Sequence, residues 1–160
     1  MRRGVKGIGV MVVASCLAAC AQLPGKAPPV TYTFQVADGT ITLRWNCGKT
    51  ERGALQVAGT AAHSTAAGFV KDVQTTVVGL DAKDKTVTTG SGYTLDYRIA
   101  ATEPSRFFVT LALASTAVRY DLQYRYWYES EGGKVGGVPA EEHRDTKTDA
   151  CPAVQPASAP

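Results

Sequence analysis

The chain has few residues that could act as a general acid or base near neutral pH, because His63 and His143 are its only histidines. A histidine that acts as a general base needs a nucleophile and an orienting carboxylate within hydrogen-bond reach. His63 ends an alternating stretch, beside Ser64 and Thr65, and we expect it to be an exposed loop residue. His143 lies in the charged segment 141–145 (EEHRD), which satisfies no metal-ligand spacing and is typical of a solvated loop. We therefore predict no catalytic residues, no bound metal and no cofactor.

Several carboxylates lie in segments that have the composition of turns. Asp38 precedes Gly39, and this pair is a common hairpin turn. Asp81 and Asp84 are spaced like two ligands of a calcium loop, but the glycine and the terminal glutamate of that loop are missing. Aspartates in turns accept hydrogen bonds from nearby backbone N–H groups. We therefore expect these three aspartates to shape turns.

Aromatic residues between positions 120 and 128 are the best candidates for binding. Tyr120 and Tyr124 alternate with charged residues, which favours the inner face of a sheet. Tyr126, Trp127 and Tyr128 are consecutive, so their side chains fall on both faces of a strand. These three predict an exposed aromatic spot that binds a peptide or a sugar, the alternative being that they continue the inner face.

The start of the chain has the layout of an export signal. A basic beginning is followed by the apolar stretch 7–14, which is far shorter than the ~20 residues that span a bilayer. The sequence Leu17-Ala18-Ala19-Cys20 then resembles the lipobox of bacterial lipoproteins. The resemblance implies cleavage before Cys20 and attachment of acyl chains such as palmitate to that residue.

Two alternatives and one sorting signal accompany this resemblance. Cys16 follows residues that also fit the pattern loosely, and an ordinary secretory signal with incidental cysteines is the other alternative. Ala21 is not the aspartate that retains lipoproteins at the inner membrane. The resemblance therefore implies the outer membrane, with the domain facing the periplasm.

Removal of the signal also removes the net charge. The excess of basic residues equals Arg2, Arg3 and Lys6, and taking these from the 17 basic residues leaves 14, the same number as the acidic residues. A neutral mature chain gives no reason to expect nucleic acid as a partner. Cys47 and Cys151 are the cysteines left after Cys20, and an oxidising periplasm favours a disulfide between them. Two free or intermolecular thiols are the alternative.

Alternation of apolar and polar residues predicts an all-β domain. We expect a signal peptide at 1–19, a proline-rich tether at 20–30, a β-sandwich at 31–129, and a loop with a flexible tail at 130–160. Glycine-rich and proline-rich composition is the reason for the last assignment. About eight short antiparallel strands are predicted, over residues 32–36, 41–47, 55–61, 73–80, 86–89, 93–99, 107–113 and 118–128.

The middle of the chain resembles the FxLYD-type immunoglobulin-like domains. The matching stretches are a glycine-containing strand at 55–61, a long strand ending in aspartate at 73–81, an outgoing strand at 85–87 and a phenylalanine strand at 106–109. The resemblance implies an immunoglobulin-like β-sandwich. Domains of this kind share no single activity, so the resemblance implies a fold and not a reaction.

These observations lead to two expectations about function. The first is a non-enzymatic envelope lipoprotein, anchored to a membrane, whose domain acts as an interaction or structural module with a protein partner in the periplasm. The second is a module that binds a small ligand or a glycan through exposed aromatic residues near Trp127.

Overall fold

The computed structural model describes residues 30–65, 68–101, 103–129 and 140–152. The predicted signal peptide, Cys20 and the predicted tether up to residue 29 lie outside these residues. In the part of the chain that is described, no helix is long and apolar enough to cross a membrane. The regular structure described is entirely β: β1 Phe34–Ala37, β2 Ile41–Lys49, β3 Leu55–His63, β4 Phe69–Leu80, β5 Thr86–Tyr93, β6 Arg98–Ile99, β7 Ser105–Leu111, β8 Arg119–Glu129 and β9 Glu141–Cys151.

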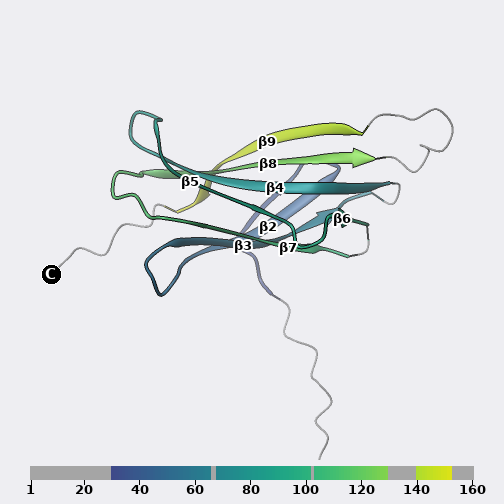
Figure 1. The fold of residues 1–160 in the computed structure, drawn as a ribbon, viewed down its shortest axis with the longest axis horizontal. Helices are drawn as coiled ribbons and strands as arrows, with labels where there is room; N and C mark the ends of the chain where they lie inside the picture. The colour runs from purple at the N-terminus through teal and green to yellow at the C-terminus, as the bar shows by residue number, and fades with distance from the viewer. Residues whose placement is uncertain (1–29, 66–67, 102, 130–139, 153–160) are drawn as a thin grey trace, which may run out of the picture. The chain divides into compact units, whose positions relative to one another are not determined.

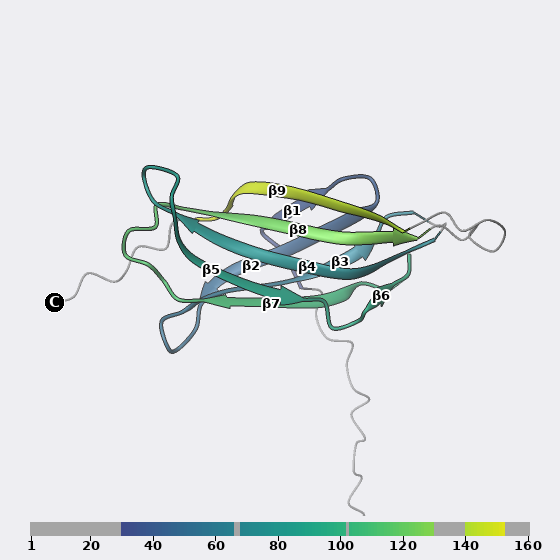
Figure 2. The ribbon, with the colours of Figure 1, turned by 45° about the horizontal axis from the view of Figure 1, so that its top comes forward.

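The strands form two antiparallel sheets that pack face to face. Sheet A has the order β1-β2-β3-β7, and sheet B has the order β5-β4-β8-β9 with β6 also paired to β4. Figure 1 shows β3 and β7 in the lower layer and β4, β8 and β9 in the upper layer. The turned view separates β7 and β5 at one side of the sandwich from β1 and β9 at the other (Figure 2). The predicted antiparallel β-sandwich is therefore confirmed.

The core lies between the sheets because apolar residues alternate with polar ones along the strands. In β7 every second residue is buried, from Ser105 to Leu111, and in β3 the same pattern runs from Leu55 to His63. Burial of each large apolar side chain contributes about 1.5–3 kcal/mol. The largest fully buried side chains are Trp45, Tyr120, Tyr126, Phe107, Ile41, Leu43, Leu55, Ile99 and Leu122.

Strand β5 closes one side of the sandwich against β7. A Cβ atom on Gly90 would lie 2.7 Å from the carbonyl oxygen of Thr110, and one on Gly92 would overlap the carbonyl oxygen of Phe108. These two glycines therefore let the backbones of β5 and β7 approach more closely than other residues would allow. The hydroxyl of Thr88 donates to the carbonyl oxygen of Ala112 at 2.9 Å and ties the same two segments together.

Two of the three predicted aspartates, Asp38 and Asp81, shape turns with their side chains. Asp38 accepts hydrogen bonds from the backbone N–H groups of Thr40 and Ile41, both at 2.9 Å, in the turn between β1 and β2. Asp81 accepts from the N–H groups of Lys83 and Lys85, at 2.8 and 2.9 Å, in the turn between β4 and β5. One oxygen of each of these two aspartates is thus engaged by the backbone, whereas the side chain of Asp84, in the same turn as Asp81, forms an ion pair with Arg119 at 3.1 Å.

The predicted disulfide between Cys47 and Cys151 is present, with 5.8 Å between the two Cα atoms. It joins β2 of sheet A to the end of β9 in sheet B. The prediction of loop and tail for residues 130–160 is wrong for Glu141–Cys151, which form β9 along β8. Its residues are exposed or half-buried except for Ala150 and Cys151 at its end. An edge strand of this kind carries no apolar alternation to reveal it.

Candidate functional site

A groove of about 470 Å³ lies on the outer face of sheet B. We call it the sheet B groove. It crosses three neighbouring strands, and its size falls within the range of ligand-binding clefts. It is lined on the outer face by Gln74 and Thr76 of β4, Gln123 and Arg125 of β8, and Arg144 and Thr146 of β9, and it is also bordered by Tyr124 and Asp145, which alternation turns toward the inner face.

The register of the sheet brings these polar residues together in rows. Gln74 pairs with Arg125, which pairs with Arg144 on the next strand. Directly opposed residues of neighbouring strands have side chains on the same face. The adjacent row, two residues along each strand, is formed by Thr76, Gln123 and Thr146.

A β-bulge in β4 extends this polar face. The register between β4 and β8 shifts between Lys71 and Gln74, and Asp72 has a φ of 53°. Two residues of β4 then oppose one residue of β8, which changes the alternation of side chains. Lys71 pairs with Trp127 and Gln74 pairs with Arg125, so both β4 residues lie on the outer face.

Hydrogen bonds hold the two arginines of the groove in place. Glu142 accepts from Nη1 of Arg125 at 3.3 Å and from Nη2 of Arg144 at 2.9 Å. Nε of Arg125 also donates to the side-chain carbonyl of Gln74. The hydrogen bonds from Arg144 and then from Arg125 hold the pKa of Glu142 below its ordinary value. The groove is thus lined by oriented donors and acceptors, with a carboxylate between its two cations.

Of the three predicted aromatic residues, Trp127 lies on this outer face. It pairs in register with Lys71 of β4 and Glu142 of β9, and its side chain is half-buried. Lys71 forms an ion pair with Glu129 at 2.8 Å on the same face. Trp127 therefore borders the row that contains Arg125, two residues away along β8.

The prediction of an exposed position is wrong for Tyr126, which is 1% exposed. Its hydroxyl donates to Asp38 at 2.8 Å, and its ring stacks on His143 with the ring centroids 5.0 Å apart. Tyr128 is half-buried, and its ring lies 5.9 Å from that of His63. Alternation along β8 explains this, because residues 126 and 128 share the inner face with Tyr120 and Tyr124, which are buried as predicted.

Both histidines lie elsewhere than predicted. His63 is buried at the end of β3, where its Nε2 is 2.9 Å from the hydroxyl of Thr65, and desolvation lowers its pKa. Within the described residues, its Nδ1 has no hydrogen-bond partner. His143 belongs to β9 and packs on Tyr126 instead of lying in a solvated loop. Neither histidine enters the sheet B groove.

Sequence reasoning missed most of the groove. Gln123 and Thr146 are ordinary exposed residues and Gln74 is half-buried in its strand, and the register of three strands brings them together. The one local signal was the alternation of polar residues along β8, which carries Gln123 and Arg125 on one face. Arg144 lies on the strand that was predicted to be a loop.

The arrangement of the two sheets defines an immunoglobulin-like β-sandwich. Among solved structures, the chain is similar to the yeast GGA1_GAE domain-P21, with a TM-score of 0.50 and 9% identity, covering 71% of this chain and 93% of that one. It also matches the GAE domain of GGA2p from Saccharomyces cerevisiae, with a TM-score of 0.49 and 5% identity, over 74% and 96% of the two chains. No family model matches the chain, and no curated protein matches it by sequence. The similarity to the GGA1 domain confirms the predicted fold class, and at 9% identity it shows the fold alone.

Proposed function

We propose that the chain is a membrane-anchored, non-enzymatic interaction module of a bacterial envelope. Lipid on Cys20 holds it at the periplasmic side of the outer membrane, and the sheet B groove is its binding face. The lipobox-like Leu17-Ala18-Ala19-Cys20 supports the anchor. The observation that carries the binding role is the row of oriented polar side chains across β4, β8 and β9.

The chemistry of the groove suits binding better than proton transfer. Its two arginines are held by Glu142, and a paired carboxylate with a lowered pKa is a poor general acid or base near neutral pH. Pre-oriented guanidinium and amide groups instead form specific hydrogen bonds with a partner at little entropic cost. A protein segment that presents carbonyl or carboxylate oxygens fits Arg125, Arg144 and Gln123.

Site-specific photo-crosslinking in intact cells tests this binding face. A benzoylphenylalanine at Gln123, an exposed residue of the groove, is compared with the same group at Gln56, an exposed residue of β3 on sheet A. We expect a defined protein adduct from position 123 and none from position 56. We also expect that Arg125→Ala, placed in the same chain, weakens the adduct. The absence of an adduct at 123, or the same adducts from both positions, would contradict the proposed face.

Trp127 supports a second candidate, a module that binds a small ligand or a glycan. An indole beside polar side chains offers an apolar platform and hydrogen bonds together, which is the usual combination for sugars. Soluble peptidoglycan fragments are the probe. We expect them to quench tryptophan fluorescence in the natural chain and in Trp45→Phe, but not in Trp127→Phe. Trp45 is buried and serves as the matched control. Equal quenching in Trp127→Phe would exclude this site.

A further inference from the structure

The chain enters the domain along the outer face of sheet A. Asn46 donates from Nδ2 to the carbonyl oxygen of Thr31 at 2.8 Å and accepts from the N–H of Thr33 at 2.7 Å. Asn46 lies on the outer face, because its neighbours in β2, Trp45 and Cys47, point inward to the core and the disulfide. In Figure 1 the first described residues, drawn in purple, leave the domain on the side of β3 and β7.

Charge is distributed unequally between the two sheets. The strands of sheet A contain no Asp or Glu, and their basic residues are Arg44, Lys49 and Arg106. Arg44 and Arg106 are exposed and lie in one row across the outer face, because both pair with Thr60 of β3. The acidic residues of the strands all belong to sheet B: Asp72, Asp121, Glu129, Glu141, Glu142, Asp145 and Asp149.

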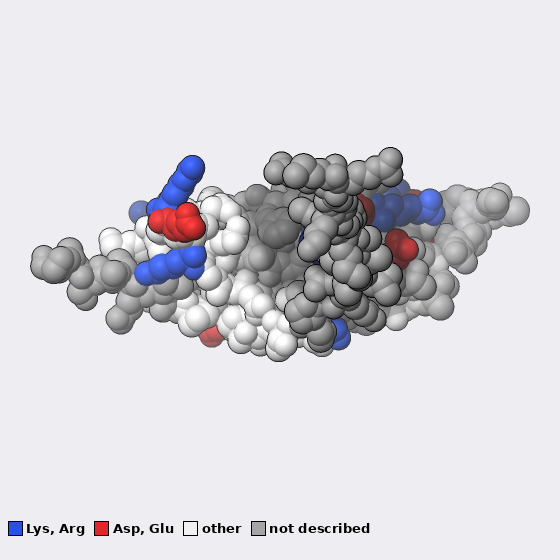
Figure 3. Space-filling model, turned by 90° about the horizontal axis from the view of Figure 1, so that it is seen from below, with Lys and Arg blue, Asp and Glu red and all other residues white. Residues whose placement is uncertain are grey.

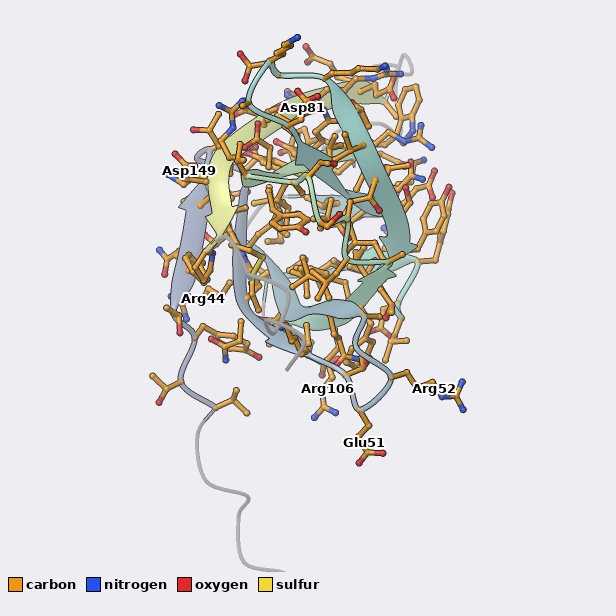
Figure 4. All side chains as sticks on the ribbon, turned by 90° about the vertical axis from the view of Figure 1, so that its left-hand side faces the viewer. Arg44, Glu51, Arg52, Asp81, Arg106 and Asp149 are labelled. Carbon is orange, nitrogen blue, oxygen red and sulfur yellow. A yellow bond between two sulfur atoms is a disulfide. The ribbon has the colours of Figure 1, made fainter. Side chains whose placement is uncertain are left out.

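The views of the molecule show where the charged side chains of the two sheets and of the turns lie. Figure 4 shows Arg44 and Arg106 on strands below Asp81 and Asp149, with Glu51 and Arg52 of the turn between β2 and β3 at the bottom of the domain. Figure 3 views the side of sheet A. Lys and Arg side chains lie beside Asp and Glu side chains toward the two ends of this side, single charged side chains appear along one edge, and uncharged residues form the rest where grey atoms leave it visible.

An exposed aromatic residue lies next to the arginine row. Phe108 is 47% exposed and pairs with Ala58, two residues along β7 from Arg106. A small neighbour leaves the ring of Phe108 standing above the sheet. An aromatic ring beside arginines is the combination that contacts the boundary between lipid headgroups and acyl chains.

We infer that the outer face of sheet A rests on an anionic lipid surface, and that the sheet B groove consequently faces away from the membrane. This inference rests on the lipid anchor of the proposed function. The ten residues between Cys20 and Thr31 reach about 30 Å when extended as a proline-rich chain. Because Thr31 is hydrogen-bonded to Asn46 on the outer face of sheet A, the tether starts from the face that carries Arg44, Arg106 and Phe108. A tether of this length keeps that face at high effective concentration beside the membrane.

The test uses the full lipidated chain, reconstituted into vesicles of phosphatidylcholine alone or with added phosphatidylglycerol. Hydroxyl-radical footprinting with mass spectrometry compares the oxidation of Phe108 with that of Trp127. Each arginine near an anionic surface raises the affinity of the protein for that surface about fivefold. We therefore expect phosphatidylglycerol to slow the oxidation of Phe108 by about threefold or more. Oxidation of Trp127 stays unchanged. Equal oxidation of Phe108 on both kinds of vesicle would overturn the inference.

Two pairs of charge reversals separate a specific face from net charge. Arg44→Glu with Arg106→Glu removes the protection of Phe108, whereas Lys83→Glu with Lys147→Glu keeps it. Lys83 lies in the turn between β4 and β5, Lys147 lies on β9, and both are exposed. The two pairs change the net charge equally. Loss of protection in both would overturn the inference, because a specific face would then not be involved.

Two further outcomes distinguish this inference from the proposed function. A chain that floats with both kinds of vesicle but never protects Phe108 is anchored, and only the orientation fails. If the mature chain purified from its native membrane carries no lipid and floats with neither kind of vesicle, the anchor and the orientation are overturned together. Protection of Phe108 in intact cells, but not on phosphatidylglycerol vesicles, means that another envelope component covers this face, and it also overturns the membrane contact.

Discussion

The indole Nε1 of Trp45 donates a hydrogen bond of 2.8 Å to the carbonyl oxygen of Ala150, which lies 105 residues further along the chain. The neighbouring residues, Cys47 and Cys151, form the disulfide. The end of β9 is thus fixed to β2 by a covalent bond and by a buried hydrogen bond. Because β9 supplies Arg144 and Thr146 to the sheet B groove, this attachment also supports one wall of the binding face.

Removal of the disulfide is expected to destabilise the domain substantially. It closes a long loop, with a sequence separation of 104, and native disulfides of small secreted domains typically contribute about 2–5 kcal/mol. We expect the double variant Cys47→Ala with Cys151→Ala to lose about that much free energy of unfolding in urea titrations. A variant with the stability of the natural chain would show that the hydrogen bond of Trp45 and the packing of β9 suffice.

The close approach of β5 to β7 predicts a sharp difference between two glycine substitutions. Gly92→Ala places a methyl group against the carbonyl oxygen of Phe108, and overpacking of this kind destabilises by about 1–3 kcal/mol or more. Gly48→Ala is the matched control, because nothing lies within 4 Å of a Cβ atom there. We expect thermal unfolding to show a large loss for Gly92→Ala and a change within about 1 kcal/mol for Gly48→Ala. Similar melting temperatures for the two variants would refute the close packing.

Tyr126 links sheet B to the first turn of sheet A. Burial and the hydrogen bond to Asp38 both raise its pKa, since the neutral phenol is the favoured form. We expect Tyr126→Phe to lower the free energy of unfolding by about 1–3 kcal/mol, because a hydrogen bond to a charged group is lost. Tyr97→Phe is the control, with a side chain that is 68% exposed, and it should change stability little. Equal effects in urea titrations would argue against this bond.

The buried His63 predicts loss of stability in mild acid. Desolvation lowers its pKa in the folded state from the ordinary value of 6.5, so the unfolded chain takes up the proton at a higher pH than the folded chain. Its contribution to stability is therefore complete above about pH 6.5 and is lost as the pH falls from there toward the folded pKa. We expect His63→Gln to lose less stability than the natural chain over that interval. Parallel curves for the two chains would rule out this role.

Local patterns predict most of the sandwich but not its last strand. Alternation identifies β2, β3, β7 and β8, because each has one face in the core. β9 escapes prediction because Glu141–Cys151 is an edge strand whose charged residues remain exposed along most of its length. Its pairing with β8 is a property of the assembled sheet. Cys151, predicted to form the disulfide, is the one local sign that this segment belongs to the domain.

The candidate site is harder to predict than the fold, since it depends on register. Trp127 could be selected from its sequence, because an aromatic residue on the charged face of a strand is unusual. Its neighbours Tyr126 and Tyr128 were selected with it, and alternation turns both toward the inner face. Gln74 and Arg144 join the site through cross-strand pairing with Arg125, and the bulge in β4 decides which β4 residues face outward.

Anchoring through Cys20 is the claim on which the proposed role depends, and mass spectrometry of the mature chain purified from its native membrane tests it most directly. We predict a first residue of Cys20 that carries a diacylglyceryl group and an N-terminal acyl chain, and a Cys20→Ser chain that lacks both. A mature chain that begins elsewhere, or one whose Cys20 carries no lipid, would contradict the account of a membrane-anchored module.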